Sequence, residues 1–525
     1  HQKKSGTLGR GYRDMKYKRF HAAYDDSIKL LKDLIAGSEY NNIGFFASSV
    51  DKENYKRLFS RDAFWVGMAG LLSGETDLIQ GYKNSLETLA RNQREDGAIP
   101  SNVTHDGKVS YGVVNPRVDS TTLFVIGALQ YCKREKISVK GDFCISKVRG
   151  AVSYLENNWE NPETDLLYIP RAGNWADEYL QQGYVLYDEA LWYYVLKEYG
   201  EMLGKQGHRN GEVYIGKSKK VAKCIRDRFW MKMLKEDGSI YTKKLVRLFD
   251  LDKEGFFLHF YHLMSKEEKG MGHPHRTFDA FGNILVLLAG LASSEQSEKI
   301  RRFIDNISVN GYPLVPAHYP FMPEKLFKTY KLYQYRFKEY IGHYHNGGLW
   351  PWYTGLYAAY LAKIGDRERA MKYLGGVLKA NEKMSRGAGY YEYHMNNAAS
   401  LETTVMHEEG ISLFMSMIMK NIVLDRKSMV LLKYKRKKVD LSDDMAVRDL
   451  RVPKGGEIKI TAVGPDAELI LKDMMELSDK ETSCLSGGHI TVKRDKPFGV
   501  PFLGVSAAAY IIGYKAVFEN KVIFE

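Results

Sequence analysis

Residues 344–352 read YHNGGLWPW and bring a His, an Asn, two glycines and two tryptophans into one short stretch. The glycine pair allows a sharp bend and a close approach of the backbone to a ligand. The Trp rings offer flat apolar surfaces beside the hydrogen-bonding groups of His345 and Asn346. Pro351 suits the first position of a helix, which the apolar pattern of residues 355–362 continues. The stretch is typical of a loop that delivers polar and aromatic groups to a site, and the alternative is an ordinary aromatic-rich turn.

Amphipathic segments with helical spacing recur along the chain on both sides of this loop. They come mostly in consecutive pairs, and the long loops between pairs hold most of the Trp, Asn, His and acidic clusters. We therefore predict a ring of helical hairpins whose long loops gather at one end and form the site. A plain bundle or solenoid would not place such clusters in alternate loops, and no fixed repeat length is visible. The predicted helices cover residues 21–36, 59–72, 76–92, a segment after 119, 145–157, 186–202, 217–230, 278–291, 295–307, 350–364, 367–380 and 408–422.

The pattern changes after Asp425. Residues 457–461 and 489–493 alternate between apolar and polar, and residues 507–518 and 522–524 are apolar and contain many β-formers. We predict three regions from these changes: a basic N-terminal arm at residues 1–20, a helical catalytic domain at 21–425, and a small β domain at 426–525.

Composition limits the kinds of partner. The chain has 525 residues, 44% of them hydrophobic, which is enough for a large core. It has no long apolar run, so we expect no membrane span. Net charge is +13, but it is dispersed apart from residues 433–438, which we expect to be a solvated face and not a nucleic-acid site. Four cysteines without metal-like spacing predict reduced thiols and a cytoplasmic protein.

The HPH sequence at residues 273–275 is the nearest approach to a metal motif. Its central Pro predicts a turn, and no third ligand lies near it in sequence, so we expect neither a metal nor another cofactor. The sequence leaves the oligomeric state open.

Two acidic clusters in aromatic loops carry the chemistry. NWADEY at residues 174–179 sets Asp177 between Trp175 and Tyr179, and desolvation there would raise the pKa of a carboxyl, as a general acid requires. YYEYHMN at residues 390–396 sets Glu392 beside His and Asn, which would keep it ionised and aim a water. Singly, each acid is more often a solvated loop charge, but the two together are the arrangement of a glycosidase.

The chain resembles the six-hairpin, (α/α)6 inverting glycosidases, which include alkaline/neutral invertases, trehalases and amylo-α-1,6-glucosidase relatives. The resemblance runs in order from about residue 59 to residue 422. Its anchors are FSRD at 59–62, GAIP at 97–100, VDS at 118–120, the 177–189 segment, FDAFGN at 278–283, HNGGLWP at 345–351 and YEY at 391–393.

The resemblance implies a mainly α fold, an (α/α)6 six-hairpin toroid, here followed by the small β domain. It also implies that Asp177 is the general acid and Glu392 the general base, with Glu178 as a rival for the acid. The implied reaction is inverting hydrolysis of a short α-linked sugar, in particular an α-glucoside. The residues that we expect to bind this small carbohydrate are Arg61, Asp62, Trp65, Asp119, Trp175, Tyr184, His345, Asn346, Trp350 and Trp352.

Three alternatives stay open. An α/α-barrel epimerase or isomerase would use histidines as acid and base. A phosphorylase would need an anion site, and a non-catalytic sugar-binding protein would keep the pocket without the chemistry.

Overall fold

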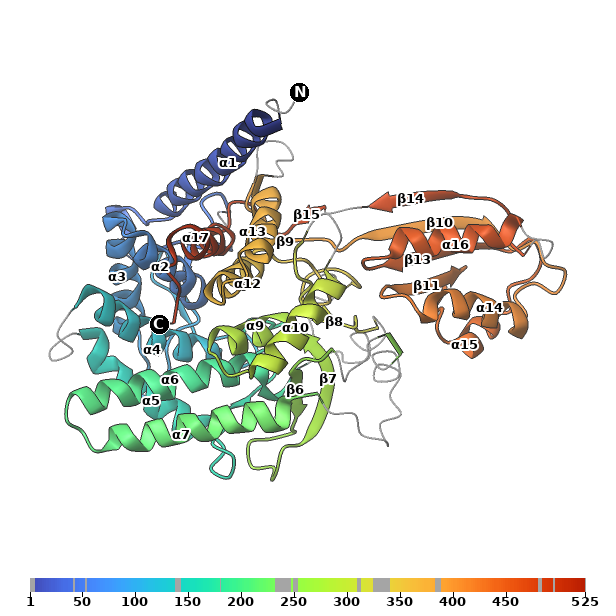
Figure 1. Ribbon diagram of the computed structural model, residues 1–525. Coiled ribbons are helices and arrows are strands. Elements are labelled where there is room, and N and C mark those ends of the chain that lie inside the picture. Colours follow the sequence, from blue (N-terminus) through green and yellow to red (C-terminus); the bar gives the residue numbers. More distant parts are fainter. Residues whose placement is uncertain are drawn as a thin grey trace.

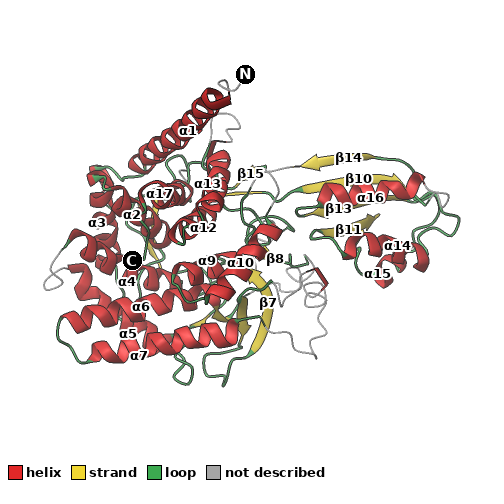
Figure 2. Cartoon of the chain, viewed as in Figure 1, coloured by secondary structure: helices red, strands yellow, loops and turns green. Residues whose placement is uncertain are grey.

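The computed structural model describes residues 5–40, 43–51, 54–136, 143–179, 181–231, 247–248, 254–308, 313–323, 340–382, 389–479, 484–493 and 496–524. It has two parts, a ring of helices and a smaller sheet domain that extends from one side of the ring (Figures 1 and 2). Each part has its own hydrophobic core. None of the described helices combines the length and the apolar composition that crossing a membrane requires.

Six inner helices form a closed ring, in which each helix packs against the next and the last packs against the first. Because an outer helix returns the chain between consecutive inner helices, the inner helices run in the same direction and their N-terminal ends meet at one end of the ring. The predicted (α/α)6 toroid is therefore confirmed. In ring order, the inner helices are α2 (Ser60–Ser73), α4 (Val118–Glu135), α6 (Leu186–Lys205), α9 (Ala280–Leu288), α12 (Pro351–Lys363) and α17 (Gly504–Glu519).

The outer helices differ from the inner ones in their burial. In α10 only Ile300, Phe303, Ile304 and Ile307 are buried, which is one helical face, whereas every residue of α9 is buried. An outer helix therefore needs an amphipathic sequence, and an inner helix is apolar around most of its circumference. The outer helices are α1 (Ser5–Asp33), α3 (Thr76–Arg91), α5 (Phe143–Asn158), α7 (Asn210–Cys224) with the π-helical turn η2 (Ile225–Phe229), α10 (Ser294–Ile307) and α13 (Arg367–Glu382).

Short strands lead into several inner helices and fix where they begin. The strand β1 precedes α2, β5 precedes α6 and β7 precedes α9, and the residue before each helix is extended. The first sheet has the order β1-β2-β3, and the second β4-β5-β6-β7-β8. Their bounds are β1 (Arg57–Phe59), β2 (Asn102–Thr104), β3 (Val109–Ser110), β4 (Tyr168–Ile169), β5 (Gly183–Val185), β6 (Leu258–His262), β7 (His273–Asp279) and β8 (His318–Tyr319), and a 3₁₀ turn, η1, spans Ser38–Tyr40.

Helix α17 closes the ring, which corrects the prediction that residues 426–525 form a β domain. It lies between α2 and α12 and pairs with α1 as the sixth hairpin, so the first and last helices of the chain form one unit (Figure 1). Residues 507–518 are buried on nearly all sides, and this removes the polar face by which a surface helix is recognised. The predicted arm at residues 1–20 is also part of structure, because α1 begins at Ser5, although residues 1–4 lie outside the described part.

The sheet domain is built from residues between β9 and β15. Its five strands have the order β12-β11-β13-β10-β14, and α14, α15 and α16 pack on them. The helix predicted at residues 408–422 is therefore α14 of this domain and not a ring helix. The basic run at 433–438 is exposed on the β11–β12 hairpin apart from the half-buried Tyr434, as expected. The bounds are β9 (Tyr393–His394), β10 (Ala398–Thr404), α14 (Leu413–Leu424), β11 (Met429–Tyr434), β12 (Lys437–Asp440), α15 (Asp444–Arg448), β13 (Glu457–Val463), α16 (Ala467–Asp479), β14 (His489–Lys493) and β15 (Pro497–Phe498).

Ring closure depends on a close contact between α12 and α17. A Cβ atom at Gly355 would lie 2.3 Å from the backbone oxygen of Ala509, so Gly355→Ala would force the two helices apart. We expect this substitution to lower the free energy of unfolding by about 1–3 kcal/mol, as overpacking does, in urea denaturation. Gly375→Ala on α13 is the matched control, because its Cβ would meet only Phe20 at 3.7 Å. Equal stability of the two variants would contradict the close contact.

Candidate functional site

Aspartates gather at the end of the ring where the inner helices begin. Asp62, Asp119 and Asp188 lie in the first turns of α2, α4 and α6, and Asp279 is the N-cap of α9, where its side chain accepts a hydrogen bond from the Gly282 N–H. The N-terminal end of a helix carries partial positive charge and stabilises a nearby carboxylate. The helices thus concentrate acidic groups at one end of the ring.

Arg61 joins two of these helices. Its Nε and Nη2 atoms each lie 2.8 Å from Oδ2 of the buried Asp119, and the Tyr187 hydroxyl donates to the same oxygen at 3.3 Å. Burial is the largest single effect on Arg61 and acts to lower its pKa, but Asp119, Tyr187, Asp62 and Asp177 together raise the pKa overall. Burial also raises the pKa of Asp62 to about 6, where Arg61 opposes the rise and Glu392 adds to it. Arg61 and Asp62 are only partly buried, so both retain exposed surface.

The loop that carries Asp177 and Glu178 is held by Arg117. One guanidinium nitrogen lies 2.6 Å from Asp177 Oδ2, and another donates to the carbonyl of Ala172. The Asp177 side chain is 33% exposed, whereas Glu178 is 7% exposed. The structure corrects the expectation that aromatic side chains surround the Asp177 carboxyl group, because the ion-pair partner of this group is Arg117.

The two aromatic neighbours of Asp177 in sequence belong to the core instead. The Tyr179 ring stacks on His318, with a centroid distance of 4.2 Å. Trp175 is the centre of an aromatic cluster beneath the loop, because its ring contacts side chains from α6, α9, α12 and the 344–352 loop. These are Tyr187, Phe281, His345, Trp350, Trp352 and Tyr353.

Glu392 is fixed by two segments that are distant in sequence. Its Oε1 accepts a hydrogen bond from the Tyr55 hydroxyl at 3.2 Å, and its backbone N–H donates to the Val500 carbonyl at 3.1 Å. Strand β15 pairs with β9, and the left-handed Gly499 that follows lies so close that a Cβ there would be 2.3 Å from Glu392 Oε2. Glu392 is 5% exposed.

The polar neighbours expected beside Glu392, His394 and Asn396, also make hydrogen bonds with the 344–352 loop. The His394 backbone bonds with Leu349, and the Asn396 amide donates to the Gly347 carbonyl at 3.0 Å. They join the 390–396 segment to the 344–352 loop.

The two acidic segments converge on the same pair of tyrosines. Burial raises the pKa of Tyr55 well above its ordinary value, and Glu392, Asp62 and Asp177 raise it further. Burial likewise raises the pKa of Tyr344, with added contributions from Glu392, Tyr55, Asp177 and Glu178. Carboxyls that the sequence places far apart therefore act on the same two tyrosines, which is the central observation about this site.

Several residues expected to contact a ligand lie in the core. The Asn346 amide bonds both the N–H and the carbonyl of Met322, at 2.8 Å each, and the Trp350 indole N–H donates to the Tyr344 carbonyl at 3.1 Å. The hydroxyl of Tyr184, on strand β5, accepts a hydrogen bond from Thr164 at 3.3 Å. Six of the side chains expected to bind the ligand are packed in the interior and are not accessible from the surface: Trp65, Tyr184, His345, Asn346, Trp350 and Trp352.

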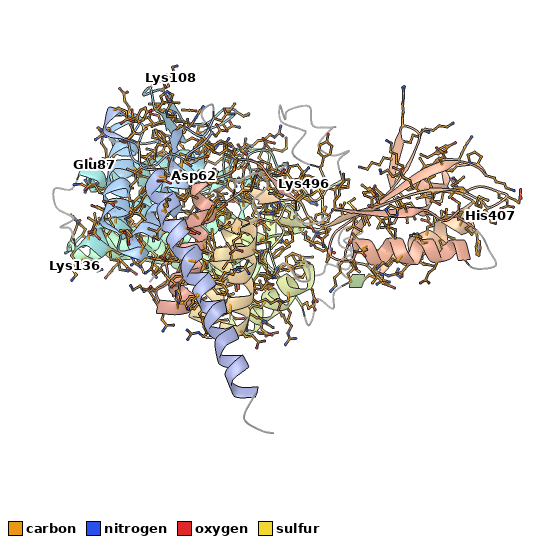
Figure 3. The ribbon with its side chains drawn as sticks, turned by 90° about the horizontal axis from the view of Figure 1, so that it is seen from above. Asp62, Glu87, Lys108, Lys136, His407 and Lys496 are labelled. Atoms are coloured by element: carbon orange, nitrogen blue, oxygen red, sulfur yellow. The ribbon has the colours of Figure 1, made fainter. Side chains whose placement is uncertain are left out.

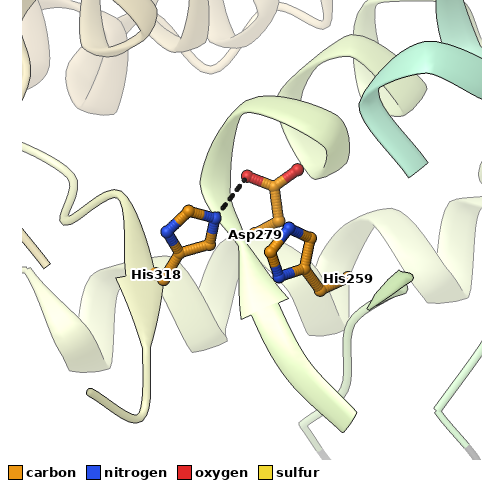
Figure 4. Close-up of side chains that lie close together, drawn as sticks. All are labelled: His259, Asp279 and His318. Atoms are coloured by element: carbon orange, nitrogen blue, oxygen red, sulfur yellow. Dashed lines mark ion pairs between the residues drawn. The ribbon is translucent and has the colours of Figure 1, made fainter. Parts of the chain in front are cut away.

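A buried trio of potential metal ligands, His259, Asp279 and His318, lies beside the loop (Figure 4). One ligand atom from each lies within 4.8 Å of the others. However, the two imidazole rings stack with centroids 4.4 Å apart and planes 26° from parallel. Lone pairs in such planes do not meet at one ion at normal metal–nitrogen distances of about 2.0–2.1 Å. The geometry therefore does not suit a metal, and the HPH sequence at 273–275 is part of strand β7 and not a turn.

Two members of this trio, His318 and Asp279, are placed to share a proton. His318 Nδ1–H donates to the His345 carbonyl, and burial lowers the pKa of His318 to about 4, so its Nε2 is bare near neutral pH. That atom lies 3.5 Å from Asp279 Oδ1, and burial raises the pKa of Asp279 to about 7. A protonated Asp279 can donate to His318, whereas an ionised one faces a lone pair.

The residues that complete the site but escaped the sequence are Tyr55, Arg117, Gly499, Gln181 and His259. Arg117 directly precedes the 118–120 anchor, and this was the one available signal. The others come from segments whose closeness only the closed ring creates.

Comparisons with known proteins found similarity only among solved structures: no family model and no curated protein matches the chain. The similar solved structures named below are glycosidases. One, a glycosidase, has a TM-score of 0.46 and 12% identity over 70% of this chain and 85% of its own. A bacterial glucoamylase complexed with acarbose has a TM-score of 0.47 and 18% identity over 69% of this chain and 50% of its own. A rhamnosidase from Klebsiella oxytoca with rhamnose bound has a TM-score of 0.44 and 14% identity over 69% of this chain and 56% of its own. Values this low do not transfer a function, and membership of the invertase or trehalase families stays a prediction.

The raised pKa of Asp279 makes stability depend on pH. The folded chain holds a proton on Asp279 between its ordinary value of 3.8 and about 7, whereas the unfolded chain does not, so stability falls as pH rises through this range. Asp279→Asn keeps an amide N–H for His318 and does not titrate. We expect the variant to gain melting temperature relative to wild type at pH 8 but not at pH 4. An equal difference at both pH values would contradict ionisation of Asp279.

Proposed function

We propose that the chain is an inverting glycoside hydrolase that acts on a short α-linked sugar, in particular an α-glucoside. The observation that carries the proposal is that Glu392, which accepts a hydrogen bond from Tyr55, and the Asp177–Glu178 loop act on the same two tyrosines, Tyr55 and Tyr344. Hydrolysis by inversion needs one carboxyl to protonate the leaving oxygen and another to activate water. A site that collects carboxyls from distant segments around partly exposed polar groups supports this chemistry.

In this proposal Asp177 protonates the glycosidic oxygen. Its side chain is more exposed than Glu178 and can reach a substrate, which supports it over that rival. Arg117 orients the Asp177 carboxyl group in the free protein, and in this proposal the entering substrate separates the pair. Glu178 is the alternative acid if the pair persists.

Glu392 is the proposed general base, which takes a proton from a water on the opposite face of the sugar. The Tyr55 hydroxyl donates to Oε1 of this carboxylate at 3.2 Å and so helps to orient the proposed base. The distance between acid and base should be roughly 6.5–9.5 Å to leave room for that water. Arg61 and Asp62 retain exposed polar surface and are the proposed partners of the sugar hydroxyls, with Asp119 holding Arg61 in place.

The acid and base roles are tested by substitution. Asp177→Asn and Glu392→Gln should each lower kcat by roughly 10²–10⁴, as loss of acid–base help does, on a panel of glucosides, mannosides, sucrose and trehalose. Glu178→Gln is the matched control and should retain activity. The first product, followed by NMR, should have the inverted anomeric configuration.

The outcomes separate the parts of the proposal. Full activity of Asp177→Asn with loss in Glu178→Gln would move the acid by one residue. A product of retained configuration would reject the inverting mechanism, and no hydrolysis of any panel member would reject the proposed activity on these sugars.

Gly499 tests whether β15 positions the base. Gly499→Ala would place a methyl group against Glu392 and displace its carboxylate, and a displacement of about 1 Å can cost on the order of 10² in rate. Gly455→Ala controls for backbone strain, since Gly455 has nearly the same positive φ, 77° against 79°, but nothing within 4 Å of its Cβ position. We expect kcat to fall in the first variant only, and equal activities would contradict the positioning of Glu392 by Gly499.

A further inference from the structure

A chain of buried side-chain hydrogen bonds connects the sheet to the loop that bears Asp177 and Glu178. It starts at Thr277, whose hydroxyl lies 3.3 Å from His259 Nδ1, and continues from His259 Nε2 to Gln181 Oε1 at 2.7 Å. Gln181 Nε2 then donates to Asn174 Oδ1 at 2.5 Å, and Asn174 Nδ2 donates to Asp188 Oδ2 at 2.6 Å. All five residues are buried.

The proton positions in this chain follow from the backbone N–H of Ala176, which can only donate. It donates to Asn174 Oδ1, so this atom is the amide oxygen, the Asn174 NH₂ group faces Asp188 Oδ2, and the same oxygen accepts from Gln181. Gln181 therefore turns its NH₂ group toward Asn174 and its oxygen toward His259. That oxygen can only accept, so His259 carries its proton on Nε2 and accepts from the Thr277 hydroxyl through Nδ1. Each donor in the chain faces an acceptor in this one arrangement.

The chain holds both ends of the acidic loop. Asn174 lies before Asp177 and Gln181 lies after Glu178, and both are joined to each other and to groups outside the loop. Asn174 Oδ1 also accepts from the Ala176 N–H at 3.1 Å. Between these ends, Tyr179 stacks on His318, which stacks on His259. The position of the loop thus depends on the ring of His259, which lies on β6.

We propose that His259 and Gln181 are positioning residues that set the proposed general acid against the leaving group of the substrate. This inference rests on the proposed glycoside hydrolysis. Neither residue touches the substrate in this proposal: both act through the loop. Their effect should appear in the step that uses the acid, which is protonation of the glycosidic oxygen.

A pair of substrates isolates that step. Maltose, or whichever glycoside of the panel the wild type cleaves, has a sugar alkoxide as its leaving group and needs the acid. The glycosyl fluoride of the same sugar and anomeric configuration releases fluoride, which leaves without prior protonation. Both need the general base and the same sugar-binding groups, so the ratio of their kcat/KM values reports on the acid.

His259→Leu removes the hydrogen bond to Gln181, and His259→Gln restores an N–H donor at nearly the position of the imidazole Nε2. We expect His259→Leu to lower kcat/KM for the glycoside by roughly 10²-fold or more, as misplaced acid catalysis does, and to change the fluoride rate by less than tenfold. His259→Gln should recover most of the loss. His275→Leu, on the neighbouring strand β7, is the matched control and should alter neither rate.

The same assay can overturn the inference. Equal losses on glycoside and fluoride in a folded His259→Leu variant, checked by circular dichroism, would show that His259 supports the structure in general and not the acid. No loss on either substrate would show that the loop does not depend on it. A wild type that hydrolyses neither substrate would reject the proposed function, and the inference with it, whereas wild-type activity with unaltered ratios would reject the inference alone.

Discussion

The structure depends on the parallel direction of its six inner helices. Because all of them begin at one end of the ring, their partial positive charges converge there, and aspartates in the first turns of α2, α4 and α6 can be buried or half-buried beside one another. Helix ends alone do not offset this much desolvation. Arg61 neutralises Asp119 across two helices, and the amide of Asn174 bonds Asp188. A site rich in carboxyls is therefore a result of how the ring is built.

Aromatic packing supplies the rigidity that hydrogen bonds to loops need. Trp175 lies where the acidic loop meets the 344–352 loop and the starts of α6, α9 and α12, so these segments pack on one aromatic cluster. The tryptophans that the sequence predicted as sugar-binding residues are buried in this cluster, and Arg61 and Asp62 are the expected binding residues that keep exposed polar surface. Figure 3 shows Asp62 within the ring, Lys496 between the ring and the sheet domain, and His407 at the far end of that domain.

The sequence was informative where one segment decides its own structure. Helical periodicity predicted the ring, because outer helices such as α10 must keep a polar face, and the clustering of acids in long loops predicted where charge would gather. The prediction of strands was wrong for α17, because burial on nearly all sides leaves no helical periodicity in its sequence. The placement of α14 in the ring was also wrong, because an amphipathic helix can pack on a sheet as well as in a ring. The partners of Asp177 and Glu392 could not be predicted, because Arg117, Tyr55 and Gly499 come near them only through tertiary contacts.

The position of α17 has a consequence for how the protein is made. The sheet domain interrupts the ring between α13 and α17, with Glu392 just before the interruption and Gly499 just after it. A ribosome therefore completes the inserted domain before the sixth inner helix emerges, and until then the ring has a gap beside α2 and α12. Glu392 acquires Gly499 and Val500 as neighbours only after the inserted domain has been made. Assembly of the site thereby waits for the synthesis of residues 504–519, and a chain truncated before residue 504 would carry the candidate acidic residues in a ring that cannot close.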